Sequence, residues 1–311
     1  MSITYVRHAD IDQEKWNRCI DHAVNGLIYG YSYYLDIMSA DWDALVMNDY
    51  EMVMPLTWNK KFGINYLRQP AFTQQLGIFS PSFISDDVTK EFLKKAMEAF
   101  SFAEINLNYN NEYKRAAAVW PNSVLLLNKP FIEIEKNFRK DFVKKIKSNS
   151  LLYDADDKVE NVISSFIENY SNRIHASPQD YKNLLRLYQL LKEKEQLFIR
   201  KVTAPDGQLL SIAIFLKDKR RIYYVMSITL PEGRKKESNY FLLYHVIKEF
   251  SYQNLIFDFE GSAIASIQLF FKKFGAIEES FPVVRMNHLP FFIKSAKEIY
   301  DRFKFGKKRN G

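Results

Sequence analysis

Two acidic residues stand two positions apart in an otherwise apolar segment near the end of the chain. The segment LIFDFEG (255–261) carries Asp258 and Glu260 between aromatic and aliphatic residues. Because side chains alternate along a strand, this spacing predicts that both carboxylates lie on one face. Gly261 and Ser262 then begin a helix, which places Glu260 at a strand-to-helix junction, where ligand-facing residues of α/β folds gather. Glu260 and Asp258 are therefore candidate catalytic bases. The alternative is a structural role, in which the carboxylates pair with an Arg or with backbone N–H groups.

A second group of polar residues lies in the first half, over 66–80 (YLRQPAFTQQLGIFS). We expect a strand here that bends at Pro70. Gln side chains donate and accept hydrogen bonds at once, which suits them to substrate recognition. The candidate substrate-binding residues are Arg68, Gln69, Gln74 and Gln75. The alternative is that they satisfy hydrogen bonds of turns and edge strands.

A basic turn precedes a helix at 229–247 (TLPEGRKKESNYFLLYHVI). The N-terminus of a helix favours phosphate groups through its free N–H groups and its dipole. We expect Arg234, Ser238 and Asn239 to bind a phosphate group, although Gly233 has no second glycine spaced for a phosphate loop. The alternative is a solvated cationic turn.

Several classes of protein are disfavoured. None of the five His residues is separated from an acidic residue by the spacing typical of metal ligands, so we expect no metal site. The single Cys19 allows no disulfide and favours a reducing compartment. The N-terminus lacks the apolar region of a signal peptide, and no apolar run approaches 18 residues. We therefore expect a cytoplasmic protein without a transmembrane segment.

Composition and charge set wider bounds. The chain has 311 residues, 47% hydrophobic and 26% charged, which is typical of a globular protein with one large or two medium domains. The net charge of +7 alone is weak support for a nucleic-acid-binding function. That function would predict a steep dependence of binding on salt.

Hydrophobic periodicity predicts an α/β protein with mixed sheets and two halves of similar element order. In the first half, strands are expected at 3–7, 44–48, 51–61, 62–72, 74–80, 102–108 and 123–128, and helices at 12–24, 32–38 and 86–100. A charged helix at 132–149 would connect the halves. In the second half, strands are expected at 151–156, 196–204, 208–217, 221–228, 255–261 and 280–286, and helices at 158–173, 178–194, 238–252, 262–274 and 290–303. The predicted domains are 1–130 and 151–311, with 131–150 as a basic linker helix.

The second half resembles the Fem-like branch of the GNAT acyltransferase superfamily. The resemblance rests on Phe257-Asp258-Phe259-Glu260-Gly261, on Phe270-Phe271-Lys272-Lys273-Phe274-Gly275 and on the basic segment 138–149. It is similar, too, to a group of bacterial GNAT-like proteins with an Asp-Phe-Glu-Gly-Ser motif. Fem-like enzymes add amino acids from aminoacyl-tRNA to peptidoglycan precursors and have tandem GNAT folds, so the resemblance implies two GNAT-like domains, the first degenerate.

The same resemblance implies an acyl or aminoacyl transferase that acts on a substrate amine. Acyl-CoA or aminoacyl-tRNA would be a co-substrate, with no tightly bound cofactor. The acceptor would be a small molecule or a cell-wall precursor, and tRNA would be a candidate partner whereas DNA would not. Ser262 and Lys272 are further substrate-binding candidates, although the family lysine position is occupied here by Phe271 and Lys272 follows about 100° further round the helix. The alternative function is a non-catalytic binding protein that keeps the scaffold without the donor loop.

Overall fold

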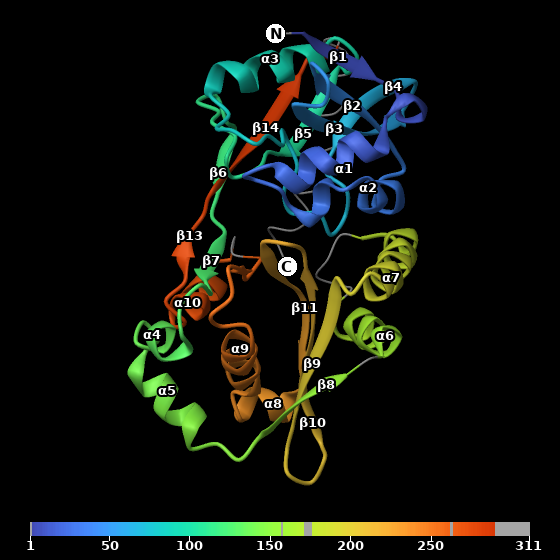
Figure 1. Ribbon diagram of the computed structural model, residues 1–311. Helices are drawn as coiled ribbons and strands as arrows, with labels where there is room; N and C mark the ends of the chain where they lie inside the picture. The colour runs from blue at the N-terminus through green and yellow to red at the C-terminus, as the bar shows by residue number, and fades with distance from the viewer. Residues whose placement is uncertain (1, 157, 171–175, 262–263, 290–311) are drawn as a thin grey trace, which may run out of the picture.

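The computed structural model describes residues 2–156, 158–170, 176–261 and 264–289. These residues form two lobes, each built around a seven-stranded mixed sheet (Figure 1). The strand order is β1-β2-β3-β4-β5-β14-β6 in the first sheet and β13-β7-β12-β11-β10-β9-β8 in the second. Each sheet is antiparallel except for one parallel pair, β4 with β5 and β11 with β12.

The first lobe places its helices on both faces of its sheet. Its strands are β1 (Ile3–Val6), β2 (Asp41–Met47), β3 (Met52–Lys61), β4 (Ile64–Arg68), β5 (Phe102–Asn106), β6 (Ala118–Trp120) and β14 (Phe281–Asn287). Its helices are η1 (His8–Asp10), α1 (Gln13–His22), η2 (Ile28–Gly30), α2 (Ser32–Met38) and α3 (Asp86–Ala96). Helix α3 packs on one face, and α1 and α2 pack on the face toward the second lobe.

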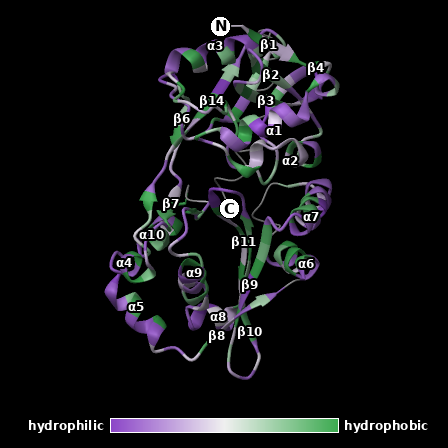
Figure 2. Cartoon of the chain, viewed as in Figure 1, coloured by the Kyte–Doolittle hydropathy of each residue, from purple (hydrophilic) through white to green (hydrophobic). Residues whose placement is uncertain are grey.

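The second lobe has the same layered arrangement. Its strands are β7 (Ser123–Leu126), β8 (Leu152–Asp156), β9 (Leu197–Thr203), β10 (Leu209–Lys217), β11 (Arg221–Thr229), β12 (Ile256–Asp258) and β13 (Ile277–Glu278). Its helices are α4 (Phe131–Glu135), α5 (Lys140–Lys147), α6 (Val159–Tyr170), α7 (Pro178–Glu193), α8 (Pro231–Lys235), α9 (Ser238–Glu249) and α10 (Ala265–Lys272). Figure 2 shows apolar residues concentrated on β9 and β11 and polar residues along α5 and α8.

One apolar core joins the lobes. Buried side chains of α1 and α2, such as Trp16 and Leu35, belong to the same cluster as Leu187 of α7 and Ile214 of β10. Helix α7 therefore packs against α2 across the lobe contact. A shared core of this kind holds two lobes together more firmly than the polar interfaces typical of separate domains.

A two-stranded ribbon crosses from one sheet to the other. Strand β6 continues through Asn122 into β7, and β13 continues through Glu279 into β14. Asn122 and Glu279 exchange backbone hydrogen bonds of 3.2 and 3.0 Å at the crossing. The predicted domain boundaries at residues 130 and 151 therefore do not coincide with the division into two sheets. Strand β7 lies before these boundaries but belongs to the second sheet, and β14 lies after them but belongs to the first.

Several local predictions are confirmed, and the reasons lie in the sequence. Helix α7 begins after Ser177, whose side chain forms a capping box with Asp180, and Pro178 occupies the first turn. Strands β9, β10 and β11 form the expected antiparallel series. The helix expected at 290–303 lies outside the described residues.

The predicted linker helix at 132–149 is wrong as a single helix. It is divided into α4 and α5, because Arg139 has an extended backbone and its N–H donates to the carbonyl of Lys273 at 2.9 Å. The break lets Phe138 and Phe142 both pack against Phe274. The expected strand at 74–80 is also absent from the described sheets, apart from a bridge between Phe79 and Val53.

Another difference concerns the segment between β11 and α9. The turn at 231–235, expected to be a loop, is the short helix α8.

Among the helices that the structure describes, we find none with both the length and the apolar character needed to cross a bilayer.

Candidate active site

Asp258 ends strand β12 and is fixed by three groups. It is 1% exposed, and its Oδ2 lies 2.6 Å from Nη1 of Arg221, which is 2% exposed. Its Oδ1 accepts hydrogen bonds from Asn122 Nδ2 at 2.9 Å and from the N–H of Glu260 at 3.0 Å. Arg221 also contacts Glu279 at 2.7 Å. A buried carboxylate with all these partners is a structural group, since a buried charge is tolerated only when it is matched.

Glu260 takes a different direction from Asp258, although only Phe259 separates them. Strand β12 ends at Asp258, and Glu260 has a φ of 51°, in the left-handed region that few non-glycine residues adopt. Its Oε1 accepts a hydrogen bond from the hydroxyl of Tyr29, in η2 of the other lobe, at 2.5 Å. The prediction of two carboxylates on one strand face is therefore wrong, because the alternation stops where the strand stops.

The surroundings of Glu260 favour its protonated form. Burial raises the pKa of Glu260 well above its ordinary range, and the negative charge of Asp258 raises this pKa further. The hydrogen bond from Tyr29 and the charge of Arg221 act in the opposite direction. The residue as a whole is half-buried. A carboxylate of this kind is a stronger base than an exposed one, which suits it to proton abstraction.

Tyrosines from both lobes pack around Tyr29, which contacts this carboxylate. The Tyr29 ring lies 5.3 Å from the Tyr34 ring and 5.6 Å from the Tyr223 ring. The Tyr223 hydroxyl donates to Asp218 at 2.5 Å and accepts from the N–H of Ile28 at 3.0 Å. These tyrosines join the lobes beside Glu260. They carry no local sequence signal, since Tyr29 and Glu260 lie 231 positions apart in the chain.

The predicted residues Gln74 and Gln75 lie in the network around Asp258. Gln74 Nε2 donates to Asn122 Oδ1 at 3.3 Å, and Gln75 Nε2 donates to Gln74 Oε1 at 2.7 Å. Gln75 Oε1 accepts from the N–H of Tyr109 at 2.8 Å, and the Tyr109 ring lies 5.0 Å from the Arg221 guanidinium. A chain of hydrogen bonds therefore connects Gln75 and Gln74 of the first lobe, through Asn122, to Asp258. The carboxylate of Asp258 in turn accepts the N–H of Glu260.

Other predicted substrate-binding residues are not brought to this network. Gln69 bonds to the carbonyl of Thr73 and the N–H of Asn106, which shapes its own loop. Arg68 is exposed at the end of β4, and Lys272 is exposed at the end of α10. Ser262 lies outside the described residues.

The predicted donor-phosphate residues lie where α8 and α9 meet. Arg234 Nε donates to the carbonyl of Thr229 at 3.1 Å, and Asn239 Oδ1 accepts from the Tyr224 hydroxyl at 2.9 Å. The Ser238 hydroxyl is buried and has no hydrogen-bond partner among the described residues. Gly233 is packed so closely that an added Cβ would lie 2.1 Å from the carbonyl oxygen of Leu210. The turn is thus folded against β10, and an open glycine loop is absent from this described segment.

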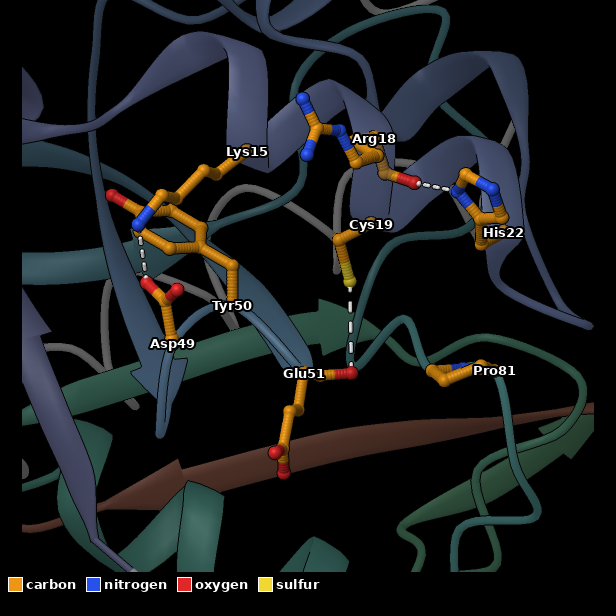
Figure 3. Close-up of a pocket in the computed structure, with 8 residues that line it drawn as sticks. All are labelled: Lys15, Arg18, Cys19, His22, Asp49, Tyr50, Glu51 and Pro81. Carbon is orange, nitrogen blue, oxygen red and sulfur yellow. Dashed lines mark hydrogen bonds and ion pairs between the residues drawn. The ribbon is translucent and has the colours of Figure 1, made fainter.

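A surface cavity lies apart from Glu260. It has a volume of about 290 Å³ and lies on the first lobe between α1, the β2–β3 turn and Pro81 (Figure 3). Its wall mixes Lys15, Arg18 and His22 with Asp49 and Glu51, and Lys15 is already paired with Asp49 at 2.6 Å. The described residues contain no cluster of three metal-ligating side chains.

Known structures share this fold. No family model and no curated protein matches the sequence. The crystal structure of FemX has a TM-score of 0.62 at 12% identity, over 90% of this chain and 96% of that one. The C-terminal domain (DUF2156) of a putative lysylphosphatidylglycerol synthetase from Agrobacterium fabrum gives 0.51 at 10% identity, over 93% and 97%. N-myristoyltransferase of Saccharomyces cerevisiae with bound myristoyl-CoA gives 0.50 at 12% identity, over 92% and 83%.

These likenesses define the class of fold. The chain has the mixed α/β architecture of GNAT-like acyltransferases, with two sheets in tandem, as the sequence resemblance predicted. At such low identity the likeness concerns the fold alone, and the chemistry must be argued from the site.

Proposed function

We propose that this protein transfers an acyl or aminoacyl group to a substrate amine, with Glu260 as the general base. The observation that carries the proposal is the position of Glu260: at the end of a central strand, in a left-handed backbone conformation, and directed to the tyrosines of the other lobe. A fold shared with FemX and N-myristoyltransferase supports this class of reaction. Asp258 then orients Glu260 through the hydrogen bond to its N–H.

The proposed reaction needs one proton acceptor and one activated acyl group. Glu260 takes a proton from the acceptor ammonium, directly or through water, and the free amine attacks the acyl carbonyl. The new C–N bond forms as the carbonyl electron pair moves to oxygen, and the return of that pair breaks the bond to the leaving group. The leaving group departs with the second amine proton, and Glu260 later releases its proton to solvent.

The donor is an acyl-CoA or an aminoacyl-tRNA in this proposal. N-myristoyltransferase was solved with myristoyl-CoA, which supports the first, and the sequence resemblance to Fem-like enzymes supports the second. The proposed contacts of the donor phosphate are Arg234 of α8, with Ser238 and Asn239 in the first turn of the twelve-residue helix α9. The acceptor amine would belong to a small molecule or a cell-wall precursor.

The test replaces the base and keeps the fold. Glu260→Gln should abolish acyl transfer from acetyl-CoA or charged tRNA, because an amide does not accept the proton. The matched control is Glu133→Gln, an exposed residue of α4 that lies outside the network. Full turnover by Glu260→Gln would refute the assignment, and loss of turnover in the control would show that the assay responds to charge alone.

A second candidate function is a non-catalytic binding protein on the same scaffold. The packing of Gly233 against Leu210 supports it, because this turn has no room for a phosphate close to the backbone. Thermal or urea unfolding with ligand separates the two functions. A donor at 100 times its dissociation constant should stabilise an enzyme by about 2.7 kcal/mol. No stabilisation by acetyl-CoA and no binding of charged tRNA would favour the non-catalytic protein.

A further inference from the structure

Tyr29 joins the proposed base to the opposite lobe. It lies in η2 of the first lobe and is 2% exposed, and its hydroxyl donates to Oε1 of Glu260 at 2.5 Å. Glu260 follows β12, a strand of the second sheet. The hydrogen bond therefore connects the two lobes directly, and one oxygen of the carboxylate is held by a side chain from the lobe that does not carry Glu260.

The backbone on both sides of Tyr29 is fixed. On one side, the N–H of Ile28 donates to the hydroxyl of Tyr223, in β11 of the second lobe, at 3.0 Å. On the other side, the carbonyl of Gly30 accepts from Nε1 of Trp16, in α1 of the first lobe, at 2.8 Å. Both hydrogen bonds are buried, and each lobe supplies one of the two side chains. Tyr29 is therefore held in place by both lobes at once.

The Tyr29 ring is fixed as well. It packs edge to face against the rings of Tyr34 and Tyr223, with centroids 5.3 and 5.6 Å away. Close packing of this kind restricts a buried ring to one rotamer. The hydroxyl therefore points to Glu260 in the protein without substrate. A donor that is held by its surroundings is what a precisely directed catalytic group requires.

We propose that Tyr29 is a positioning residue whose hydroxyl holds the Glu260 carboxylate in the orientation that accepts the proton of the substrate ammonium. The inference rests on the proposed function, because it gives Tyr29 a role in proton transfer to Glu260. Burial raises the pKa of Tyr29 well above its ordinary range, so its hydroxyl keeps its proton and remains a donor. The proton balance of the reaction is unchanged, since the ammonium proton goes to Glu260.

Charged groups of the buried network also act on Glu260. Burial raises the pKa of Glu260 most, and the charges of Asp258 and Glu279 raise this pKa further. The hydrogen bond from Tyr29 and the charge of Arg221 lower it. Two neighbouring tyrosines interact with the charge of Glu260 as well: Tyr34 and Tyr188. Without the Tyr29 hydroxyl, the carboxylate loses a donor that stabilises its ionised form, so Glu260 should take up its proton at higher pH.

The variant Tyr29→Phe removes this hydroxyl and keeps the ring. Tyr31→Phe is the matched control, because Tyr31 belongs to the same apolar cluster and its hydroxyl donates to the carboxylate of Asp21 at 2.6 Å. Each variant loses one hydroxyl that donates to a carboxylate. A purely structural effect should therefore lower the urea midpoint of both variants by similar amounts.

Steady-state kinetics over a range of pH, with acetyl-CoA and charged tRNA tested as donors, give the first readout. A misplaced catalytic group lowers a rate by up to about 10²-fold. We therefore expect kcat of Tyr29→Phe to fall by about 10- to 100-fold, with KM little changed. The acid limb of its kcat profile should also move to higher pH. Tyr31→Phe should keep the wild-type profile.

A second readout needs no turnover. In each background, Glu260→Gln is added and the change in the free energy of unfolding is followed with pH, because this change varies through the folded pKa of Glu260. The pH dependence should move to higher pH in Tyr29→Phe and stay as in wild type in Tyr31→Phe.

The outcomes separate this inference from the proposed function. The assignment of Tyr29 is overturned, while the transferase stands, if kcat of Tyr29→Phe stays within about 3-fold of wild type. It is equally overturned if either pH dependence fails to move, or if Tyr31→Phe behaves in the same way. If the wild-type protein transfers no acyl group from either donor, the proposed function is overturned, and the role of Tyr29 in proton transfer with it.

Discussion

Replacing Arg221 with Met removes the positive charge from the buried network between the lobes. Arg221 holds Asp258 at 2.6 Å and Glu279 at 2.7 Å, and its guanidinium lies against the Tyr109 ring. Met fills a similar apolar volume but leaves two carboxylates without their cation. Because Arg221 and Asp258 are almost entirely buried, solvent has little access to compensate the remaining charge.

The expected cost follows from that burial. Breaking a buried ion pair by removing one partner costs about 3–5 kcal/mol, because an uncompensated charge stays in the interior. This corresponds to a factor of roughly 10² to several 10³ in the unfolding equilibrium constant. The combined variant Arg221→Met, Asp258→Asn, Glu279→Gln should recover most of the loss, since the amide that replaces the Asp258 carboxylate would keep an oxygen to accept the hydrogen bonds of Asn122 and Glu260.

Urea unfolding at pH 7 measures these differences. The control is Arg285→Met, which removes an exposed Arg285–Glu104 ion pair of 2.7 Å on β14 and should cost less than about 1 kcal/mol. If Arg221→Met costs no more than this control, the buried pair contributes no more than a surface pair, and our account of the network is wrong. If the triple variant is less stable than Arg221→Met, charge is not the cause of the loss.

Two other predictions concern the site and the donor turn. Glu260→Gln should be more stable than wild type at neutral pH, because ionisation of Glu260 in the folded protein is unfavourable. The pKa of Glu260 is higher in the folded protein than in the unfolded chain, where it is about 4.3. The free energy of unfolding of the wild type should therefore fall as the pH rises from about 4.3 through the folded pKa. Below about pH 4.3, urea titrations should give the two proteins similar free energies of unfolding. Gly233→Ala should cost about 1–3 kcal/mol in urea unfolding, because its Cβ would lie 2.1 Å from the Leu210 oxygen. A loss below about 0.5 kcal/mol would mean that α8 moves away from β10 easily.

The sequence predicted the elements whose signals are local. The capping residues Ser177 and Pro178 determine where α7 begins, and the turn at 205–207 joins β9 to β10. The crossing of the ribbon had no such signal, because β7 and β13 pair across about 150 residues, and either strand could pair within its own half. The break between α4 and α5 likewise depends on a backbone hydrogen bond to Lys273, far along the chain.

The site was predictable to a similar extent. The alternation of apolar and acidic residues predicted Asp258 and Glu260 as site residues, and the concentration of polar residues predicted Gln74 and Gln75. The structure joins these four residues in one hydrogen-bond network. The sequence did not predict their partners Arg221, Asn122 and Tyr29. Each of these lies on another element, and nothing in the residues beside it indicates its role. Tertiary contacts over long separations decide such pairings, whereas periodicity reports only which face of one element is apolar.

The ribbon crossing explains how two neighbouring carboxylates acquire different properties. At the crossing, Asn122 donates a hydrogen bond to Asp258, and Glu279 pairs with Arg221, which also pairs with Asp258. Burial, and then the negative charge of Asp258 two residues away, raise the pKa of Glu260, and Asp258 also accepts a hydrogen bond from the N–H of Glu260. A buried carboxyl group with a raised pKa in this position is the one that we assign to proton transfer. The network therefore positions Glu260 and strengthens it as a base at once, so Asn122→Ala should impair both effects without removing either carboxylate.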